Sequence, residues 1–404
     1  MPRTAATLAA FLALSASALA AAASPISVGP RPYALIDAME ESPLKTRLLA
    51  CADKPVRRTL FSIGHRGAAL QFPEHTAQSY RAAARMGAGI VECDATFTRD
   101  KVLVCRHSQN DLHRTTNILT TPLADRCAAP FRPASGARKA AATCRTTDLT
   151  AAEFLSLRGK MDSENPGATT PEDYQGGLPS WRTDLYDGAG ADLVTHAQSI
   201  ALLADLGVKF TPELKSPVVE MPYDGFARED YAQALIDEYK AAGVAPADVW
   251  PQSFRLEDVL YWIEAEPEFG AQAVFLDGRY RKGLNPADPA TFRPSMADLK
   301  SRGVNYIAPP LWMLLTVEDG AFAASAYARE ARAAGLRIIA WTVERSGSLA
   351  DGGGWYHQTI RDALKGDGSV YPVLHALATE VGVVGVFSDW PGTVSYYASC
   401  MGLD

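Results

Sequence analysis

Hydrophobic and polar residues follow a repeated pattern along this chain, in which a helical stretch ends at a glycine and an apolar segment follows at once. The pattern occurs in RMGAGIVE, DLGVKF, SRGVNYI, AAGLRIIAW and EVGVVGVF, at Gly87, Gly207, Gly303, Gly335 and Gly382. Glycine at such a position takes the left-handed backbone conformation that ends a helix. The pattern therefore predicts helices and strands that alternate through short connections.

Eight apolar segments are predicted to be strands. They cover residues 60–64, 90–94, 208–213, 249–253, 272–276, 304–307, 337–342 and 384–388. Continuous apolar runs are typical of parallel strands covered by helices, and eight such units match a (β/α)8 barrel better than an open sheet. The G-x-G-x-x-G fingerprint of the main open-sheet competitor follows none of these segments. We predict an α/β fold built on a TIM-type barrel.

Three long irregular stretches interrupt this pattern, at residues 119–191, 277–294 and 346–371. Each comes after a predicted strand and before a helix, so all three belong to the rim where barrel enzymes build their pockets. Loops of this length are uncommon unless they serve a site or are disordered. We predict long insertions on the C-terminal rim, with loose surface decoration as the alternative.

The first 23 residues have the features of a cleavable secretory signal. Arg3 precedes an apolar stretch from Leu8 to Leu19, and the small residues Ala18 and Ala20 flank its end. No later run reaches the roughly 18 apolar residues of a membrane span. We expect export to the periplasm or the medium without stable membrane insertion. The remaining residues, 24–404, are predicted to form a single barrel domain with an insertion at about 119–191.

Composition supports a globular chain and argues against one class of partner. The 404 residues are 47% hydrophobic and 21% charged, which provides enough apolar mass for a large core. The formal net charge is -7 and no basic stripe is present. Nucleic acid is therefore not expected as a partner.

Six cysteines follow the predicted signal, and in an exported chain disulfides persist. Cys127 and Cys144 bracket a short Pro, Ala and Arg stretch and are predicted to pair. Cys51 and Cys400 lie near the two ends of the folded part, which often meet in space, and are the second predicted pair. No cysteine spacing resembles a zinc site.

The second predicted strand carries two acids, Glu92 and Asp94, on one face because side chains alternate with a period of two. Two carboxylates inside a buried strand repel each other, so a positive group is expected between them. A hard divalent cation, Ca2+ or Mg2+, prefers such oxygen ligands. Glu213 and Lys215 share a face at the end of the next barrel strand and supply a third carboxylate and an ammonium group.

After this strand, Thr98-Arg99-Asp100-Lys101 is predicted to form a turn, and residues 102–107 return as the second strand of a hairpin. If Arg99 and Asp100 are the tip, Glu92 lies opposite His107 and Asp94 opposite Cys105. Cys93 and Cys105 then point to opposite faces, so they are not predicted to pair. The turn lacks the usual glycine, and a bulge that shifts this register by one residue stays open.

Two histidines lie at strand ends beside these acids. His65 belongs to Gly64-His65-Arg66-Gly67 after the first strand, and His107 ends the hairpin. Four others are expected on loops or helices, with ordinary roles: His113, His196, His357 and His375. Trp341 and Phe254, the latter beside Gln252, either line a pocket or belong to the barrel packing.

Together these residues resemble the signature of the glycerophosphodiester phosphodiesterase family. The matching motifs are His65-Arg66-Gly67, Pro73-Glu74-His75-Thr76, Gly87 to Asp94, Thr98 to Lys101, His107, Leu112 to Thr116, Glu213-Leu214-Lys215, Trp341-Thr342 and Phe387-Ser388-Asp389. They follow one another in order across residues 61–391, which is far more specific than any single motif. Three positions depart from the family pattern: His75 replaces asparagine, Lys101 replaces the turn glycine and Ser108 replaces an aspartate.

The resemblance implies metal-dependent hydrolysis of glycerophosphodiesters to glycerol 3-phosphate and an alcohol. It implies one divalent cation, Ca2+ or Mg2+, held by Glu92, Asp94 and Glu213. His65 and His107 are then the catalytic general acid and base, in an order left open. The resemblance also implies that the glycerol 2-hydroxyl attacks and gives a cyclic phosphate, which water later opens. The residues expected to bind substrate or phosphate are Arg66, Lys215, Gln252 and Trp341.

Two alternatives differ in substrate or in chemistry. One is a phospholipase D-like cleavage of lysophospholipids or sphingolipids on a similar barrel. The other is an exported protein that binds phosphodiesters without turnover, which would require the loss of a histidine or a carboxylate. All five of these residues are present, and this favours the enzyme.

Overall fold

The computed structural model describes residues 25–187 and 191–404, and within them eight parallel strands close into a barrel. The ring closes because β1 pairs with β13 on one side and with β2 on the other. The barrel strands are β1 (Thr59–Gly64), β2 (Ala88–Phe97), β6 (Lys209–Leu214), β7 (Gln252–Ser253), β8 (Val274–Leu276), β9 (Tyr306–Ala308), β12 (Arg337–Val343) and β13 (Gly385–Ser388). The predicted TIM-type barrel and its eight strands are confirmed.

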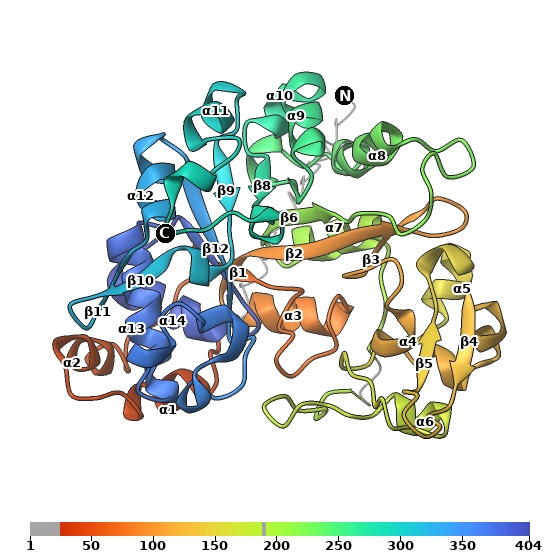
Figure 1. Cartoon of the computed structure of the whole chain (residues 1–404), viewed down its shortest axis with the longest axis horizontal. Coiled ribbons are helices and arrows are strands. Elements are labelled where there is room, and N and C mark those ends of the chain that lie inside the picture. The colour runs from red at the N-terminus through yellow and green to blue at the C-terminus, as the bar shows by residue number, and fades with distance from the viewer. Residues whose placement is uncertain (1–24, 188–190) are drawn as a thin grey trace, which may run out of the picture.

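Helices surround this barrel (Figure 1). They are α3 (Ala77–Arg85), α7 (His196–Asp205), α8 (Arg228–Ala241), α9 (Leu256–Ala265), α10 (Pro267–Gly270), α11 (Met296–Ser301), α12 (Ala326–Ala333), α13 (Val370–Ala376) and α14 (Pro391–Met401). Hydroxyl side chains fix several helix starts. The Thr76 hydroxyl accepts from the Ser79 N–H before α3, and Thr195 forms a capping box with Gln198 before α7. None of the described helices has the length and apolar character that a membrane crossing requires.

The five glycines of the repeated pattern all adopt positive φ angles, between 65° and 88°. Gly87 shows the reason most clearly, because α3 ends at Arg85 and β2 begins at Ala88. A residue with a side chain would be strained in this conformation. The pattern therefore marks real helix-to-strand junctions.

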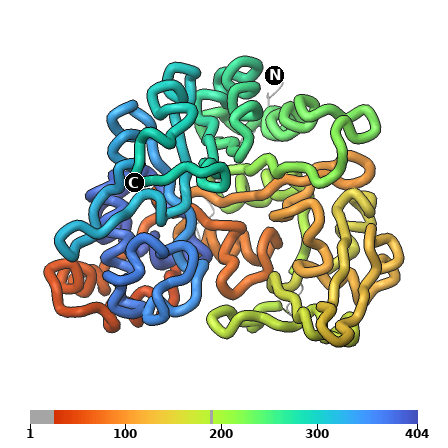
Figure 2. The backbone as a smooth tube through the Cα atoms, viewed as in Figure 1, coloured from red at the N-terminus to blue at the C-terminus, as the bar shows by residue number. Residues whose placement is uncertain are grey.

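The two ends of the described chain lie side by side. Figures 1 and 2 show the red helices α1 (Arg31–Asp37) and α2 (Pro43–Leu49) beside the blue helices α13 and α14. A disulfide between Cys51 and Cys400 joins this region, as predicted. The predicted signal peptide, residues 1–23, lies outside the described residues.

The stretch after β3 forms a compact group of small elements beside the barrel. These are α4 (Leu112–Thr115), β4 (Ala129–Arg132), β5 (Ala141–Thr143), α5 (Ala151–Leu155) and α6 (Pro171–Tyr174). Their apolar side chains pack into a hydrophobic cluster of their own, and the predicted disulfide Cys127–Cys144 lies within it. Figure 1 shows these elements gathered to one side. The insertion therefore contains regular structure, and the assignment of residues 24–404 to one domain stays a prediction.

A second small hairpin and the other long loops complete the described chain. The hairpin consists of β10 (Leu315–Glu318) and β11 (Ala321–Ala324). The loops at 277–294 and 346–371 contain only short single-turn helices, the first of which is η5 (Arg279–Lys282), until α13 begins at Val370. Both loops contribute side chains to a cavity at the barrel mouth.

The predicted hairpin forms, but its register is shifted by one residue. β3 (Leu103–Cys105) pairs with β2 so that Ala95 lies opposite Cys105. The reason is a three-residue loop, because the Thr98 N–H donates to the Val102 carbonyl and Lys101 takes the left-handed conformation with φ 66°. The pairings of Glu92 with His107 and of Asp94 with Cys105 are therefore wrong.

This shift also overturns the prediction that Cys93 and Cys105 remain apart. A change of one residue moves every side chain of a strand to the other face, so Cys105 shares the face of Cys93. The two form a disulfide. The bond lies on the face opposite Glu92 and Asp94, and it ties the hairpin to the strand that carries these two acids.

We expect the disulfide between the chain ends to stabilise the fold. Replacing both Cys51 and Cys400 by serine should lower the free energy of unfolding by about 2–4 kcal/mol, because the unfolded chain then gains conformational freedom. Urea denaturation monitored by circular dichroism measures this difference. An unchanged midpoint would show that packing of α1 and α2 alone holds the two ends together.

Candidate active site

Three carboxylates meet at the mouth of the barrel. Asp94 of β2 lies opposite Glu213 of β6 in the parallel ladder, and Glu92 points from the same face of β2. One oxygen of each lies within 4.8 Å of the others. The exposed fractions of Glu92, Asp94 and Glu213 are 4%, 1% and 6%. The structure therefore brings together the three acids that the sequence predicted as metal ligands.

Positive and polar groups surround these acids. Lys215 Nζ lies 2.7 Å from Glu213 Oε1, and Gln252 Nε2 donates to Glu92 Oε1 at 2.9 Å. The Arg66 backbone N–H donates to the second oxygen of Glu92 at 3.0 Å. Each contact satisfies one carboxylate oxygen and holds it in place.

The donor set fits a hard divalent cation. It consists of oxygen atoms alone, which is the ligand type that Ca2+ and Mg2+ prefer. In addition, Asp94 Oδ1 and Gln252 Oε1 are buried and have no hydrogen-bond partner among the described residues. A buried acceptor without a donor is costly, and a cation between these oxygens would satisfy it.

Proximity and burial shift the pKa values of these acids in different directions. Burial, with Asp94 and Glu213 nearby, raises the pKa of Glu92 well above its ordinary value. Burial also raises the pKa of Glu213 to about 7, although Lys215 opposes this. Burial acts on Asp94 as well, but Lys215 and His75 outweigh it and hold the pKa of that acid well below its usual range. The nearby positive groups thus favour the charged form of Asp94, whereas burial and mutual repulsion disfavour the charged forms of Glu92 and Glu213.

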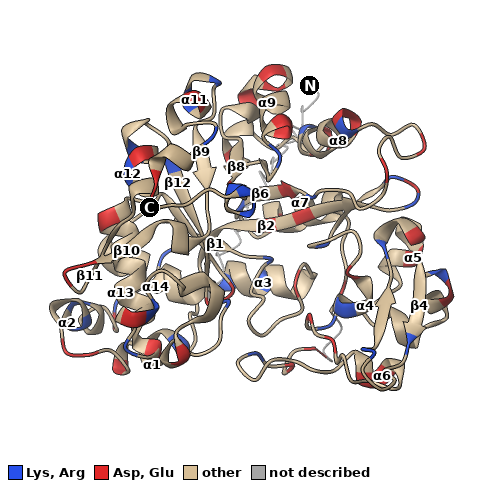
Figure 3. Ribbon diagram, viewed as in Figure 1, with Lys and Arg blue, Asp and Glu red and all other residues tan. Residues whose placement is uncertain are grey.

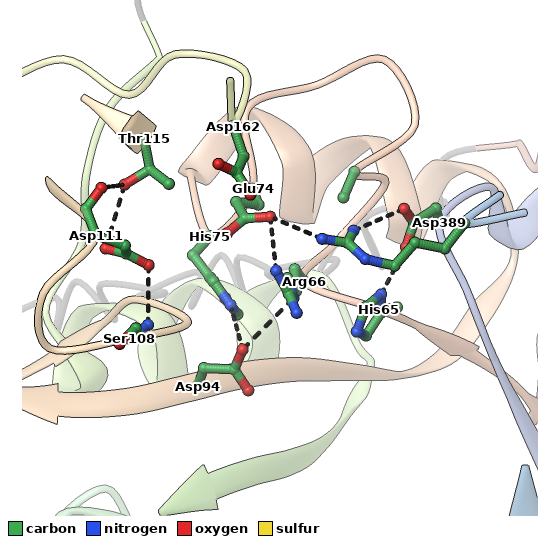
Figure 4. Close-up of polar contacts among 12 residues, drawn as sticks. His65, Arg66, Glu74, His75, Asp94, Ser108, Asp111, Thr115, Asp162 and Asp389 are labelled. Carbon is green, nitrogen blue, oxygen red and sulfur yellow. Dashed lines mark hydrogen bonds and ion pairs between the residues drawn. The ribbon is translucent and has the colours of Figure 1, made fainter. Parts of the chain in front are cut away.

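His65 is oriented by a buried acid. Its Nδ1 lies 2.5 Å from Asp389 Oδ1, and Arg345 Nη1 donates to the other Asp389 oxygen at 2.8 Å. The ring therefore presents Nε2 toward the carboxylates, 3.8 Å from Glu92 Oε2. Burial lowers the pKa of His65 to about 4, although Asp389 favours the charged ring. Figure 4 shows His65 beside Asp389.

His107 lines the same cavity from the end of the hairpin. Burial, together with Arg66 and Lys215, lowers its pKa well below the ordinary value. Side-chain atoms of His107, Glu74 and Asp111 lie within 4.8 Å of one another. The two histidines thus reach one cavity from different strands, as the sequence predicted.

Glu74 connects the two arginines of the site. Arg66 Nη1 donates to Glu74 Oε2 at 2.9 Å, and Arg345 Nη2 lies 3.6 Å from the same oxygen. Arg66 also lies 3.6 Å from Asp94, so that it is placed between two acids (Figure 4). His75 contacts Asp94 from the other side, with Nε2 2.9 Å from Oδ2.

The cavity has a volume of about 560 Å³, and one of its walls is aromatic. The rings come from Phe254, Tyr280, Trp341, Trp355 and Tyr356. Trp341 and Trp355 are stacked, with centroids 5.9 Å apart and planes inclined by 27°. Charged groups therefore occupy one part of the cavity and flat apolar faces another.

The structure places most of the predicted site residues on this cavity. Its lining includes His65, Arg66, Glu92, His107, Glu213, Lys215 and Trp341. Asp94 completes the group of acids, whereas Gln252 holds Glu92 and does not line the cavity. Lys215 pairs with Glu213 and also lines the cavity, so its role as a phosphate contact stays a prediction.

Sequence reasoning missed four residues of this network: Glu74, His75, Arg345 and Asp389. A signal for them existed, since Glu74, His75 and Asp389 lie within the motifs quoted above. Asp389 directly follows β13 and Arg345 lies two residues after β12, at the strand ends where barrel enzymes place their functional groups.

Comparisons with known proteins agree with this geometry. Residues 65–393 match the glycerophosphoryl diester phosphodiesterase family. An extracellular protein of Arthroderma benhamiae is 42% identical over 251 residues, which are 60% of this chain and the whole of that protein. The glycerophosphodiester phosphodiesterase of Bacillus subtilis is 41% identical over 58 residues, 14% of this chain and 20% of its own length.

One solved structure shows the same fold. It belongs to a Silicibacter pomeroyi protein described as a glycerophosphoryl diester phosphodiesterase. The two structures superpose with a TM-score of 0.54 at 18% sequence identity. The superposition covers 89% of this chain and 99% of that one. The barrel and its cavity thus define an α/β-barrel hydrolase of the phosphodiesterase class. More specifically, the chain belongs to the glycerophosphoryl diester phosphodiesterase family.

We expect Glu74 to be essential for stability because it compensates two buried arginines. Glu74→Gln leaves Arg66 and Arg345 with less negative charge and should lower the free energy of unfolding by about 3–5 kcal/mol. Urea denaturation gives this value. As a control, Glu318→Gln removes an exposed pair with Arg329 and should cost at most about 1 kcal/mol. Equal losses in both variants would contradict this role for Glu74.

Proposed function

We propose that this enzyme hydrolyses glycerophosphodiesters to glycerol 3-phosphate and an alcohol, using a divalent cation and two histidines. The observation that carries the proposal is the meeting of three buried carboxylates and two imidazoles at one cavity. The family match supports the substrate class. The three carboxylates offer only oxygen atoms, the ligand type that Ca2+ and Mg2+ prefer, and this supports one of these two ions.

A phosphodiester resists attack because it is negatively charged and because its leaving alkoxide is basic. Glu92, Asp94 and Glu213 would hold the cation, which would supply positive charge to stabilise the phosphodiester. Arg66 adds further positive charge from the cavity wall. The protein thereby orients the diester before any bond is broken.

The histidines carry the protons. Asp389 holds Nδ1 of His65, so His65 exchanges protons with the substrate at Nε2. His107 faces the same cavity and serves the other reacting oxygen. One ring takes the proton of the glycerol 2-hydroxyl as this oxygen attacks phosphorus, and the other gives a proton to the departing alcohol. Water then opens the resulting cyclic phosphate to give glycerol 3-phosphate.

Export is a second part of this proposal. Disulfides persist outside the reducing cytoplasm, and this chain forms three of them among its described residues. The similar Arthroderma benhamiae protein is extracellular. We infer that the chain works in the periplasm or the medium, as one barrel domain with the accessory elements of residues 119–191.

Loss of either histidine should remove turnover without unfolding the chain. We expect His65→Ala and His107→Ala each to lower the rate of glycerophosphocholine hydrolysis by roughly a hundredfold or more, the usual contribution of a positioned acid or base. Release of glycerol 3-phosphate measures the rate. His375→Ala, on α13 away from the cavity, is the control and should keep normal turnover. Near-normal turnover in either site variant would exclude that histidine.

Removal of the cation should silence the enzyme. Exhaustive chelation is expected to abolish hydrolysis, and added Ca2+ or Mg2+ to restore it. Calorimetry should detect binding of one of these ions to the native chain and no binding to Asp94→Asn, while Asp237→Asn on α8 binds normally. Full activity after chelation, or unchanged ion binding by Asp94→Asn, would refute this site.

A further inference from the structure

Arg281 stands apart from the other charged groups of the cavity. It belongs to the short helix η5, in the loop after β8, and it lines the cavity although its side chain is exposed. Its guanidinium carbon lies 5.3 Å from the Phe254 ring centroid and 5.4 Å from that of Tyr280. The two rings hold the charged group against the aromatic wall.

The other basic residues of the cavity are already paired with acids. Arg66 contacts Glu74 at 2.9 Å, Lys215 contacts Glu213 at 2.7 Å, and Arg345 contacts Asp389 at 2.8 Å. Within residues 25–187 and 191–404, no carboxylate lies within 4.0 Å of the Arg281 guanidinium. Its five N–H donors are therefore available to a bound molecule.

The aromatic wall beside Arg281 offers flat apolar faces. Trp355 is 42% exposed and stacks on Trp341, and the Tyr280 and Trp355 centroids lie 5.6 Å apart. Figure 3 shows a short blue segment of Lys and Arg beside the label of β6, near the middle of the view. Arg281 and these rings line the same cavity, so a guanidinium group and exposed rings face one space.

We propose that this wall is a subsite for a polyol head group on the diester, with Arg281 as its recognition residue. The inference rests on the proposed diesterase function and adds the class of head group. A ring such as inositol has a C–H face that packs on Trp341 or Trp355 and hydroxyls that accept from the guanidinium. Apolar surface combined with a few placed donors is the usual composition of a specific small-molecule site.

The same arrangement disfavours a quaternary ammonium head group. Aromatic faces attract such a cation, but the faces of Phe254 and Tyr280 already hold the Arg281 guanidinium. A second positive charge in the same wall is repelled by the first. The wall therefore selects a polyol over a quaternary ammonium group, because the Arg281 guanidinium attracts the hydroxyls of the first and repels the charge of the second.

Four proteins decide between these interpretations: the native chain, Arg281→Met, Arg281→Lys and Lys282→Met. Methionine keeps an apolar chain that packs on the rings but removes the charge, and lysine keeps the charge without the fork of donors. Lys282 is the matched control, because it is an exposed basic residue of the same short helix that does not line the cavity. For each protein, kcat/KM is measured with glycerophosphoinositol and with glycerophosphocholine.

We expect the native chain to prefer glycerophosphoinositol by about tenfold, the effect of one hydrogen bond to a charged group. Arg281→Met should lose most of this preference through a higher KM for glycerophosphoinositol. Arg281→Lys should keep part of it, and Lys282→Met all of it. A native preference for glycerophosphocholine, or an Arg281→Met variant with an unaltered ratio, would overturn the inference.

Binding separates this inference from the proposed function. Calorimetry with the same two diesters gives Kd values for the native chain and for Arg281→Met. Failure of the native chain to hydrolyse either diester would refute the proposed function, whereas the two Kd values would still decide the subsite. A Kd for glycerophosphoinositol that rises about tenfold in Arg281→Met supports it, and equal values overturn it.

Discussion

Electrostatic repulsion among Glu92, Asp94 and Glu213 is the constraint on which the rest of the site depends. The ladder between β2 and β6 brings the three together, and nothing in the backbone lets them separate. Two like charges about 4 Å apart repel by roughly 4 kcal/mol at an effective dielectric constant of about 20. Four groups each contact one of these carboxylate oxygens: the side chains of Lys215, His75 and Gln252, and the backbone N–H of Arg66. The remaining carboxylate charge fits a cation at this cavity.

The buried arginine beside these acids needs acidic partners of its own. Arg66 is buried, and the carboxylate of Glu74 compensates the charges of both Arg66 and Arg345. Arg345 in turn pairs with Asp389, and Asp389 orients His65. Acidic and basic side chains therefore alternate along a chain of contacts that begins at the three carboxylates and ends at His65, which lines the cavity. The orientation of that ring depends on acids that the reacting molecule does not touch.

The fold could be predicted from the sequence because five helix-to-strand junctions carry a glycine and the barrel strands lie in apolar runs. The three carboxylates could be predicted because period-two alternation fixes the faces of β2 and β6. The hairpin register could not, since it depends on a lysine in a conformation that usually selects glycine. His75 was missed for a similar reason. Its φ of 55° turns the ring back toward Asp94, a path that no periodicity records.

The cavity combines two kinds of structural support. Its charged part comes from β1, β2 and β6, where strand pairing fixes the distances between side chains. Its aromatic part comes largely from the loops after β8 and β12, which alter more freely than strands. Trp341 connects the two, because it lies on β12 and its Nε1 donates to the Ala308 carbonyl of β9 at 2.8 Å. Trp355 stacks on this fixed ring, so a loop residue is positioned by the barrel. Changes in these loops can therefore reshape the wall that meets the head group while the distances among the reacting groups stay constant.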